Sequence, residues 1–328
     1  MRVGSNPEKA NPVLPTKYGA HRVIIPVYIP EEAGYFEKSR LVVEQCLASL
    51  IASTERRAAI TVVVNAATTP TMKYLESLHA RGELDQLIVN HVNRGKVDAV
   101  VSAMRASYEP FLTVTDSDVY FYPRWLRSVE EVFAAFPESG FVSAFPCVHL
   151  AWHCTSSTVL GALLRGELRR ENRVSEADMD LFAHGIGNDG LILASHRRAQ
   201  WVVKRKGFYA CVGASHMQFT MRREVVAAIP AEPALEALSG STDRRWLDEP
   251  VDRAGLWRLS TIKAYVEHIG NVPIRGKSDK RPSPDEPPRT STAGEMALPG
   301  PRISLAGRLP TSWRRKGAGV LRRISSRL

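Results

Sequence analysis

The chain has 328 residues, 44% of them apolar and 24% charged, which is enough to bury a full hydrophobic core in one or two domains. The net charge of +10 is uneven, because residues 274–328 carry 13 Lys and Arg against 4 Asp and Glu and so account for +9 of it. The nearly neutral remainder disfavours a nucleic-acid-binding body, since such domains carry a basic surface of their own.

Apolar and β-branched runs alternate with segments of helical periodicity through the first half of the chain. We expect strands at residues 22–28, 60–65, 87–90, 111–114 and 141–145, separated by helices at residues 35–51, 71–80, 93–106 and 125–136. This alternation is typical of a mostly parallel central sheet with helices on both faces, so we predict the α/β class.

Two carboxylates follow the predicted strand 111–114. Asp116 and Asp118 are one residue apart, and they project the same way because side chains of an extended chain alternate. Open α/β sheets bind ligands at the carboxyl ends of their strands, and paired carboxylates there suit Mg²⁺ or Mn²⁺ carrying phosphates. An ordinary polar turn is the alternative interpretation, since Asp and Ser are common turn residues.

Six segments resemble, in their order along the chain, the GT-A glycosyltransferases, and most closely the large inverting family 2. They are residues 24–28, 62–65, 93–96, 116–118, 213–223 and 267–271. The resemblance covers about residues 22–272. It implies a Rossmann-like GT-A fold and the transfer of a sugar from a nucleotide-sugar donor.

The resemblance also implies which residues bind the donor and a metal ion. The nucleotide sugar would contact Pro26, Val27, Tyr28, Asn65, Asn93, Gly95, Lys96 and Asp116. Asn65 stands where relatives usually place an Asp that reads the base, so the identity of the nucleotide stays open. Mn²⁺ or Mg²⁺ would be held by Asp118, with Asp116 and His268, and would stabilise the charge on the departing diphosphate as a Lewis acid.

An inverting displacement needs a carboxylate that takes the proton of the acceptor hydroxyl. Relatives often carry an acidic pair before a helix that ends in Gly, and three acidic residues precede Gly255 here. We predict the base among them, in the order Asp248, Glu249 and Asp252. A solvated or helix-capping cluster is the alternative.

Contacts to the acceptor are predicted for His216, Met217 and Trp246, with an ordinary turn or core packing as the alternative for each. Residues 147–154 hold two Cys and two His, but their spacing matches no structural zinc pattern, so we expect buried packing there.

The last 55 residues differ in character from the rest. Residues 280–301 are rich in Pro, Ser and Thr, which is typical of a disordered linker. In residues 313–328 an apolar stripe at helical spacing lies largely opposite the Arg and Lys residues. This pattern indicates a basic amphipathic helix that contacts an anionic membrane, and a basic tail without a partner is the alternative.

We therefore predict an N-terminal extension at residues 1–20, a GT-A catalytic domain at 21–273, and a linker with a disordered basic tail at 274–328. Four cysteines without disulfide spacing, no secretory signal and no membrane-spanning run indicate a cytoplasmic protein, with the tail at the inner face of the plasma membrane.

The predicted activity is metal-dependent, inverting transfer of a sugar to a hydroxyl group of a growing bacterial glycan or a lipid-linked acceptor. A nucleotidyltransferase acting on sugar phosphates and a non-catalytic nucleotide-sugar-binding scaffold are the alternatives. A nucleic-acid partner is not expected.

Overall fold

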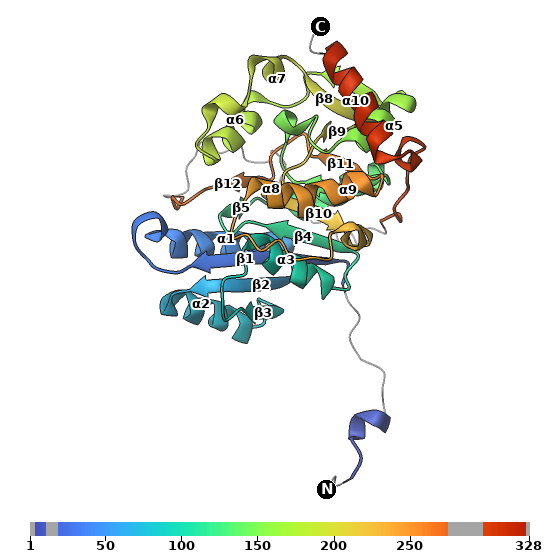
Figure 1. The fold of residues 1–328 in the computed structure, drawn as a ribbon. Helices are drawn as coiled ribbons and strands as arrows, with labels where there is room; N and C mark the ends of the chain where they lie inside the picture. Colours follow the sequence, from blue (N-terminus) through green and yellow to red (C-terminus); the bar gives the residue numbers. More distant parts are fainter. Residues whose placement is uncertain (1–3, 11–18, 275–297, 326–328) are drawn as a thin grey trace.

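A computed structural model describes residues 4–10, 19–274 and 298–325. Its centre is a ten-stranded sheet in the order β3-β2-β1-β4-β10-β6-β11-β9-β8-β7 (Figure 1). The strands are β1 (His21–Ile29), β2 (Ala58–Ala67), β3 (Gln86–Val89), β4 (Phe111–Thr115), β6 (Ser139–Ser143), β7 (Leu168–Glu171), β8 (Gln200–Arg205), β9 (Phe208–Val212), β10 (Gln218–Arg222) and β11 (Trp257–Ser260).

The sheet has a parallel half and a mixed half. Strands β3, β2, β1 and β4 are parallel neighbours. Strand β10 is antiparallel to both β4 and β6, β11 is parallel to β6, and β9, β8 and β7 follow in antiparallel pairs. Seven of these ten strands share one direction, which confirms the predicted mostly parallel sheet of the GT-A type.

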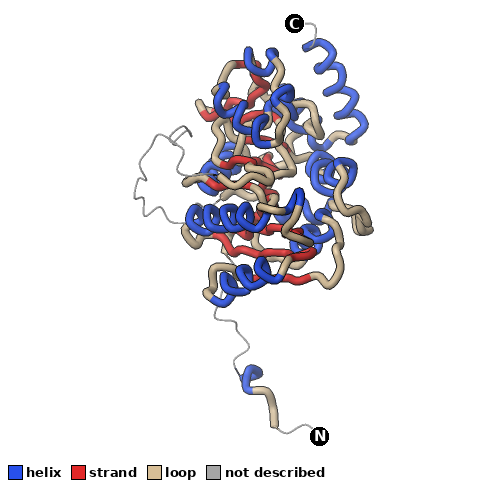
Figure 2. Tube along the Cα trace, turned by 90° about the vertical axis from the view of Figure 1, so that its left-hand side faces the viewer, coloured by secondary structure: helices blue, strands red, loops and turns tan. Residues whose placement is uncertain are grey.

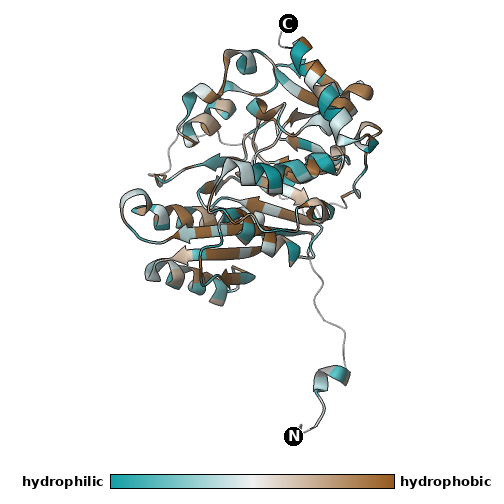
Figure 3. Cartoon of the chain, in the orientation of Figure 1, coloured by the Kyte–Doolittle hydropathy of each residue, from teal (hydrophilic) through white to brown (hydrophobic). Residues whose placement is uncertain are grey.

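Helices cover both faces of the sheet because its buried strands alternate their side chains. Val23, Ile25 and Val27 of β1 pack into the cluster that contains α1 (Ser39–Thr54), α2 (Thr69–Ala80) and α4 (Trp125–Ala135). Ile24 points to the opposite face and packs with α3 (Lys96–Arg105) and residues 246–251. The apolar strands stand out between the more polar helices in Figure 3.

The predicted elements of the first half are confirmed, with shifted boundaries: α3 begins at Lys96 rather than at residue 93, and β6 spans residues 139–143 rather than 141–145. Residues 34–36 form a 3₁₀ turn, so α1 begins at Ser39 rather than near residue 35. Lys38, with φ −108° and ψ 1°, separates this turn from α1.

Two further groups of elements complete the described fold. The insertion between β6 and β8 contains α5 (Ser156–Leu164), β7 and α6 (Glu176–Gly185), and α7 (Ala194–Arg198) leads into β8. A helical segment at 240–253 comprises α8 (Gly240–Thr242), a π-helical stretch (Asp243–Asp248) and α9 (Glu249–Arg253). Strands β5 (Val119–Phe121) and β12 (Val266–His268) form a separate antiparallel pair.

The amphipathic helix expected in the basic tail is present as α10 (Thr311–Ser325), and it packs against the protein, so these residues are ordered where a disordered tail was predicted. It lies along α5 (Figure 1), and Figure 2 shows it as the helix that leads to the C-terminus. Arg314 is almost fully buried and donates to the Ser157 hydroxyl, while Gly317 lies against Leu160. Most of the predicted disordered linker, residues 275–297, lies outside the described residues. None of the helices in the described ranges combines the length and apolar character needed to cross a membrane.

Candidate active site

Strand β1 ends beside a half-exposed aromatic side chain. Pro26 and Val27 lie within the strand, and the Val27 side chain is fully buried. Tyr28 is 44% exposed and packs edge-on against Phe36 at 5.8 Å between ring centres. Of the three residues predicted to line the base pocket, Tyr28 is therefore the one whose ring is free to meet a planar base.

Asn65, at the carboxyl end of β2, fixes the loop that leads into α3. Its amide nitrogen donates to the Gly95 carbonyl at 3.0 Å, and its carbonyl oxygen accepts from Asn90 at 2.9 Å. Asn93 accepts from the Gly95 amide at 2.8 Å within the same loop. Asn65 is buried, so both ends of its amide are used inside the protein.

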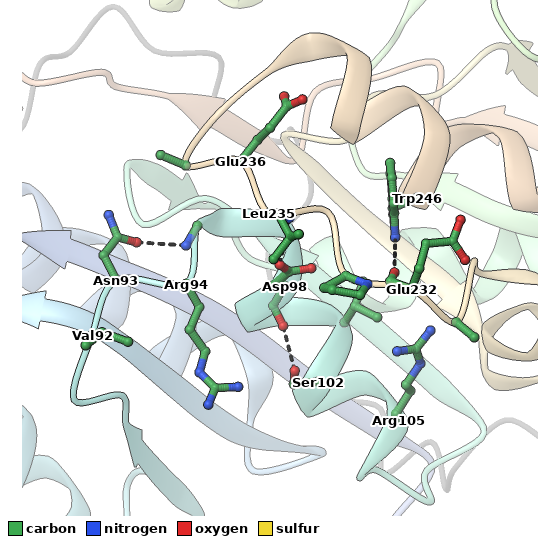
Figure 4. A pocket seen from close by; sticks show the side chains of 15 residues that line it. Val92, Asn93, Arg94, Asp98, Ser102, Arg105, Glu232, Leu235, Glu236 and Trp246 are labelled. Atoms are coloured by element: carbon green, nitrogen blue, oxygen red, sulfur yellow. Dashed lines mark hydrogen bonds between the residues drawn. The ribbon is translucent and has the colours of Figure 1, made fainter.

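A pocket of about 530 Å³ opens beside this loop, between α3 and residues 231–237 (Figure 4). Trp246 forms part of its wall and donates its indole N–H to the Glu232 carbonyl at 3.0 Å. Asp98 accepts from the amides of Ala234 and Leu235 at 2.7 and 3.1 Å. The hydrogen bonds to Asp98 therefore hold residues 231–237 across the outer face of α3.

Lys96, the first residue of α3, meets the first of the two predicted carboxylates. Its Nζ lies 2.5 Å from Asp116 Oδ1. Burial alone would lower the pKa of Lys96, but Asp116, Asp243 and Asp118 outweigh it and raise that pKa, so the ammonium group is retained. Asp116 is therefore engaged by a cation of the protein itself.

Asp118 and His268 come together because β5 and β12 pair, with His268 opposite Val119. His268 Nε2 lies 3.3 Å from Asp118 Oδ2, and His268 Nδ1 lies 2.9 Å from the Gly185 carbonyl. A ring that donates from Nδ1 to a carbonyl presents the lone pair of Nε2, which is the form that binds metals. Burial raises the pKa of Asp118 to about 6.

These two residues fit a divalent cation, whereas the full predicted trio is not assembled. Asp118 Oδ1 is buried and has no hydrogen-bond partner, so one carboxylate oxygen is available to a ligand. Over residues 4–10, 19–274 and 298–325, no group of three or more His, Cys, Asp or Glu side chains is arranged to hold a metal ion. Asp116 faces Lys96 instead.

The three predicted base candidates occupy different environments. Asp252 accepts from the hydroxyls of Ser156 and Ser157 and from the Ser157 amide at 2.7–2.8 Å, which anchors α9 to α5. Glu249 pairs with Arg244 at 3.1 Å and with Arg315 of α10 at 3.4 Å.

Asp248 is also fully engaged. It is held by Arg258 at 2.7 Å and by His153 at 2.8 Å. Burial would raise the pKa of Asp248, but Arg258, His153 and His216 outweigh that effect and lower it. A carboxylate with such partners is a weak proton acceptor.

Asp243 was not predicted from the sequence, yet it lies near Lys96 and His216 of the candidate site. Its Oδ1 is buried without a hydrogen-bond partner, and burial raises its pKa, with Lys96 and His216 acting in the opposite direction. It begins the π-helical stretch Asp243–Asp248, and such distortions are frequent at functional sites. The available sequence signal was its distance from Gly255, twelve residues on, which fits a full helix before that glycine better than the shorter spacing from Asp248.

The three residues predicted to contact the acceptor differ in access. His216 is about one-third exposed and lies between Asp243 and Asp248. Met217 is buried, and its carbonyl accepts from the Asp116 amide at 2.9 Å, so its backbone rather than its side chain touches the site. Trp246 is buried apart from its edge on the pocket.

Residues 23–152 match the family described as "Glycosyl transferase family 2". Among curated proteins, none matches the chain in sequence. Solved structures with a similar arrangement include S. aureus TarS residues 1–349, with 16% identity over 75% of this chain and 59% of that one, at a TM-score of 0.44.

The mannosyltransferase PcManGT of Pyrobaculum calidifontis, in complex with GDP-Man and Mn²⁺, has 16% identity over 75% of this chain and 55% of its own, at a TM-score of 0.41. The chain thus spans less than two thirds of either structure. The family match over residues 23–152 confirms the resemblance to GT-A glycosyltransferases of family 2 that was found in the sequence.

Proposed function

We propose that the enzyme transfers a sugar from a nucleotide-sugar donor to a hydroxyl group, with inversion and with the help of Mn²⁺ or Mg²⁺. The observation that carries this proposal is a pair of buried carboxylate oxygens without hydrogen-bond partners, Asp118 Oδ1 and Asp243 Oδ1. Buried polar atoms are normally satisfied, so two unsatisfied ones in one site point to ligands that complete them. One suits a cation and the other a hydroxyl proton.

The donor would lie along the carboxyl edge of the parallel half of the sheet. The exposed ring of Tyr28 offers a stacking surface for the base, and Lys96 supplies a positive charge for the diphosphate. Asp116, already paired with Lys96, is placed to bond sugar hydroxyls as the ammonium group turns toward phosphate.

Asp118 and His268 would hold the divalent cation, and the donor phosphates would complete its coordination. An imidazole ligand favours Mn²⁺ over Mg²⁺, which prefers oxygen ligands alone. Such a cation, when bound, stabilises the negative charge that the diphosphate gains as it leaves.

We assign the base to Asp243 in place of Asp248. The acceptor hydroxyl forms the new carbon–oxygen bond at the anomeric carbon while its proton passes to Asp243 Oδ1. The bond between that carbon and the diphosphate breaks on the opposite side, and the nucleoside diphosphate leaves with the electron pair. A raised pKa brings Asp243 closer to the range in which a carboxylate is an effective base.

A donor panel tests the activity. Wild-type protein is titrated with UDP-, GDP- and dTDP-sugars with and without Mn²⁺, and melting temperature and donor turnover are followed. We expect one nucleotide class to raise the melting temperature only with the cation present, and the Asp118→Asn variant to lose that dependence. Absence of binding and turnover with every donor contradicts the proposal, while release of pyrophosphate from a nucleoside triphosphate supports the nucleotidyltransferase alternative.

The stereochemical course needs a separate measurement. Proton NMR of the initial product reports whether the new glycosidic bond has the configuration opposite to that in the donor. A retained configuration rules out the single displacement in which Asp243 acts as base.

We further propose that the acceptor is a bacterial glycan or a lipid-linked sugar and that the enzyme meets it at an anionic membrane. Residues 298–325 carry seven Lys and Arg and no Asp or Glu. Exposed apolar side chains gather on the same segment and on the adjoining end of α5: Leu163, Leu164, Ile303, Leu305, Leu309, Trp313, Val320 and Ile324. They are eight of the 19 large apolar side chains that are exposed within the described ranges.

The pairing of α10 with α5 makes these side chains one surface. Because Arg314 contacts Ser157 and Gly317 contacts Leu160, the two helices run alongside each other in the same direction. Leu164, one turn beyond Leu160, therefore extends the strip formed by Val320 and Ile324. An apolar strip flanked by Arg and Lys fits the interface of an anionic bilayer.

Vesicle flotation tests this surface. The double variant Trp313→Ser/Ile324→Ser should lose binding to vesicles that contain phosphatidylglycerol, and wild-type binding should weaken in high salt. Tyr35→Ser removes a similarly exposed aromatic residue elsewhere and should bind as wild type does. Equal flotation of the double variant and wild type contradicts the membrane role without affecting the catalytic assignment.

A further inference from the structure

The His216 side chain lies between two buried carboxylates. Its Nδ1 is 3.4 Å from Asp248 Oδ2, and its Nε2 is 3.5 Å from Asp243 Oδ2. The side chains of Asp248 and Asp243 are only 1% and 6% exposed, whereas that of His216 is 35% exposed. The His216 imidazole thus connects Asp243, which we assign as the base, with Asp248, which the sequence analysis favoured for that role.

Of the two carboxylates beside His216, Asp248 is the one held in a fixed position. Its Oδ1 accepts from the fully buried guanidinium group of Arg258, and its Oδ2 accepts from His153. Arg258 is itself held by the Ala214 carbonyl at 2.6 Å. Because it is buried among cations and hydrogen-bond donors, Asp248 stays ionised and has one orientation.

The backbone that carries His216 is also rigid. Gly213 has a φ of 109°, and a Cβ there would lie 2.8 Å from the backbone of Leu150, so the turn is packed against its neighbours. Ser215 donates from its amide to the Ser143 hydroxyl at 3.0 Å and accepts from that hydroxyl at 3.2 Å. These contacts place the imidazole without help from a ligand.

Asp243 lacks comparable restraint of its own. Its Oδ1 has no hydrogen-bond partner, and its Oδ2 lies 3.5 Å from His216 Nε2. Lys96, Asp116 and Asp248 are the other charged groups near it. Since Lys96 pairs with Asp116 and is assigned to the donor diphosphate, His216 is the group that is placed to orient Asp243.

We propose that His216 is a positioning residue that holds Asp243 by its Oδ2 and leaves Oδ1 directed at the acceptor hydroxyl. Each ring nitrogen lies beside one carboxylate, Nδ1 beside Asp248 and Nε2 beside Asp243. Asp248 orients the ring, and the ring orients the base. The inference rests on the proposed function, because it needs Asp243 to receive the proton, and His216 itself need not touch the acceptor.

Three substitutions separate the two nitrogens of the ring. His216→Gln places an amide near the position of Nε2 and preserves the contact with Asp243. His216→Asn places its amide near Nδ1 and preserves only the contact with Asp248. His216→Ala removes both contacts. His79→Ala, at an exposed position on α2, is the matched control for loss of a histidine.

We expect kcat to fall about 10- to 100-fold in His216→Ala and His216→Asn, the range for loss of one hydrogen bond to a charged group. His216→Gln should recover most of that loss. KM for the donor, the melting temperature and His79→Ala should stay near wild type. A purely structural role predicts instead that kcat and melting temperature fall together in all three variants.

The outcomes distinguish this inference from the proposed function. A wild-type protein without transfer of any sugar overturns both. Transfer by wild type together with full activity of Asp243→Asn overturns the base and, with it, the role of His216. Activity that depends on Asp243 but is equal in His216→Gln and His216→Asn, or unchanged in His216→Ala, overturns the positioning role alone.

Discussion

The two halves of the sheet build the site in different ways. In the parallel half, Tyr28, Asn65 and Asp116 lie at or just beyond the ends of β1, β2 and β4, and the topology alone brings them to one edge. In the mixed half, His153, His216, Asp248 and Arg258 come from separate segments and are held by one another. One half depends on backbone geometry and the other on a buried charge network.

The largest expected effect is on chemistry in the mixed half. Asp243→Asn keeps the shape of the side chain but cannot accept a proton, so kcat should fall about 10²- to 10⁴-fold, as for loss of a general base. Donor binding, followed by thermal shift with Mn²⁺, should persist because it depends on the parallel half. Normal turnover of this variant would return the role of base to Asp248, Glu249 or Asp252.

The charge network is tested by Arg258→Met. This change removes the fully buried cation that pairs with the Asp248 carboxylate and should lower the free energy of unfolding by about 3–5 kcal/mol. Urea denaturation measures the loss. The double variant Arg258→Met/Asp248→Asn should recover much of the lost free energy of unfolding, because the carboxylate charge of Asp248 has been removed as well. If Arg258→Met is as stable as wild type, groups other than Arg258 compensate the buried charge of Asp248.

Backbone geometry in the parallel half is tested by Gly95→Ala. Gly95 has a φ of 77°, and a Cβ there would lie 2.1 Å from the Glu236 carbonyl. With ψ at 162°, this positive-φ extended conformation alone costs a non-Gly residue about 1–3 kcal/mol, and the close approach should add to that and displace residues 231–237. Gly82→Ala is the matched control, since Gly82 has a φ of 70° and nothing within 4 Å. Equal losses of stability in the two variants would mean that residues 231–237 move aside without a measurable cost in free energy.

The smallest expected effect is a pH dependence of stability from His153. Its hydrogen bond to Asp248 raises the pKa of His153 from 6.5 to about 9. The protonated form is favoured in the folded state, so this stability is complete below pH 6.5 and is lost as the pH rises through 9. About 1–2 kcal/mol is expected, because roughly a third of the side chain meets solvent, which weakens the pair. Urea titrations at pH 6, 7.5 and 9 should show the slope in wild type and not in His153→Gln.

How much of the candidate site could be predicted from the sequence also differs between the parallel and the mixed half of the sheet. The strands of the parallel half, the helices between them and the positions of Asn65, Asn93, Asp116 and Asp118 could be predicted, because local periodicity defines parallel strands and their ends share an edge. His268 was expected to join Asp118 by family resemblance alone, and the pairing of β12 with β5 is what brings it there.

Tertiary structure alone distinguished between neighbouring carboxylates. Asp243, Asp248, Glu249 and Asp252 lie within ten residues, and local sequence does not tell which is paired with Arg258, which with Arg315, which with Ser157 and which has an oxygen to spare. The docking of the amphipathic tail on α5 is a similar case, because periodicity shows an apolar stripe but not what covers it. Partners distant in sequence decide both, since burial and charge depend on every element that packs nearby.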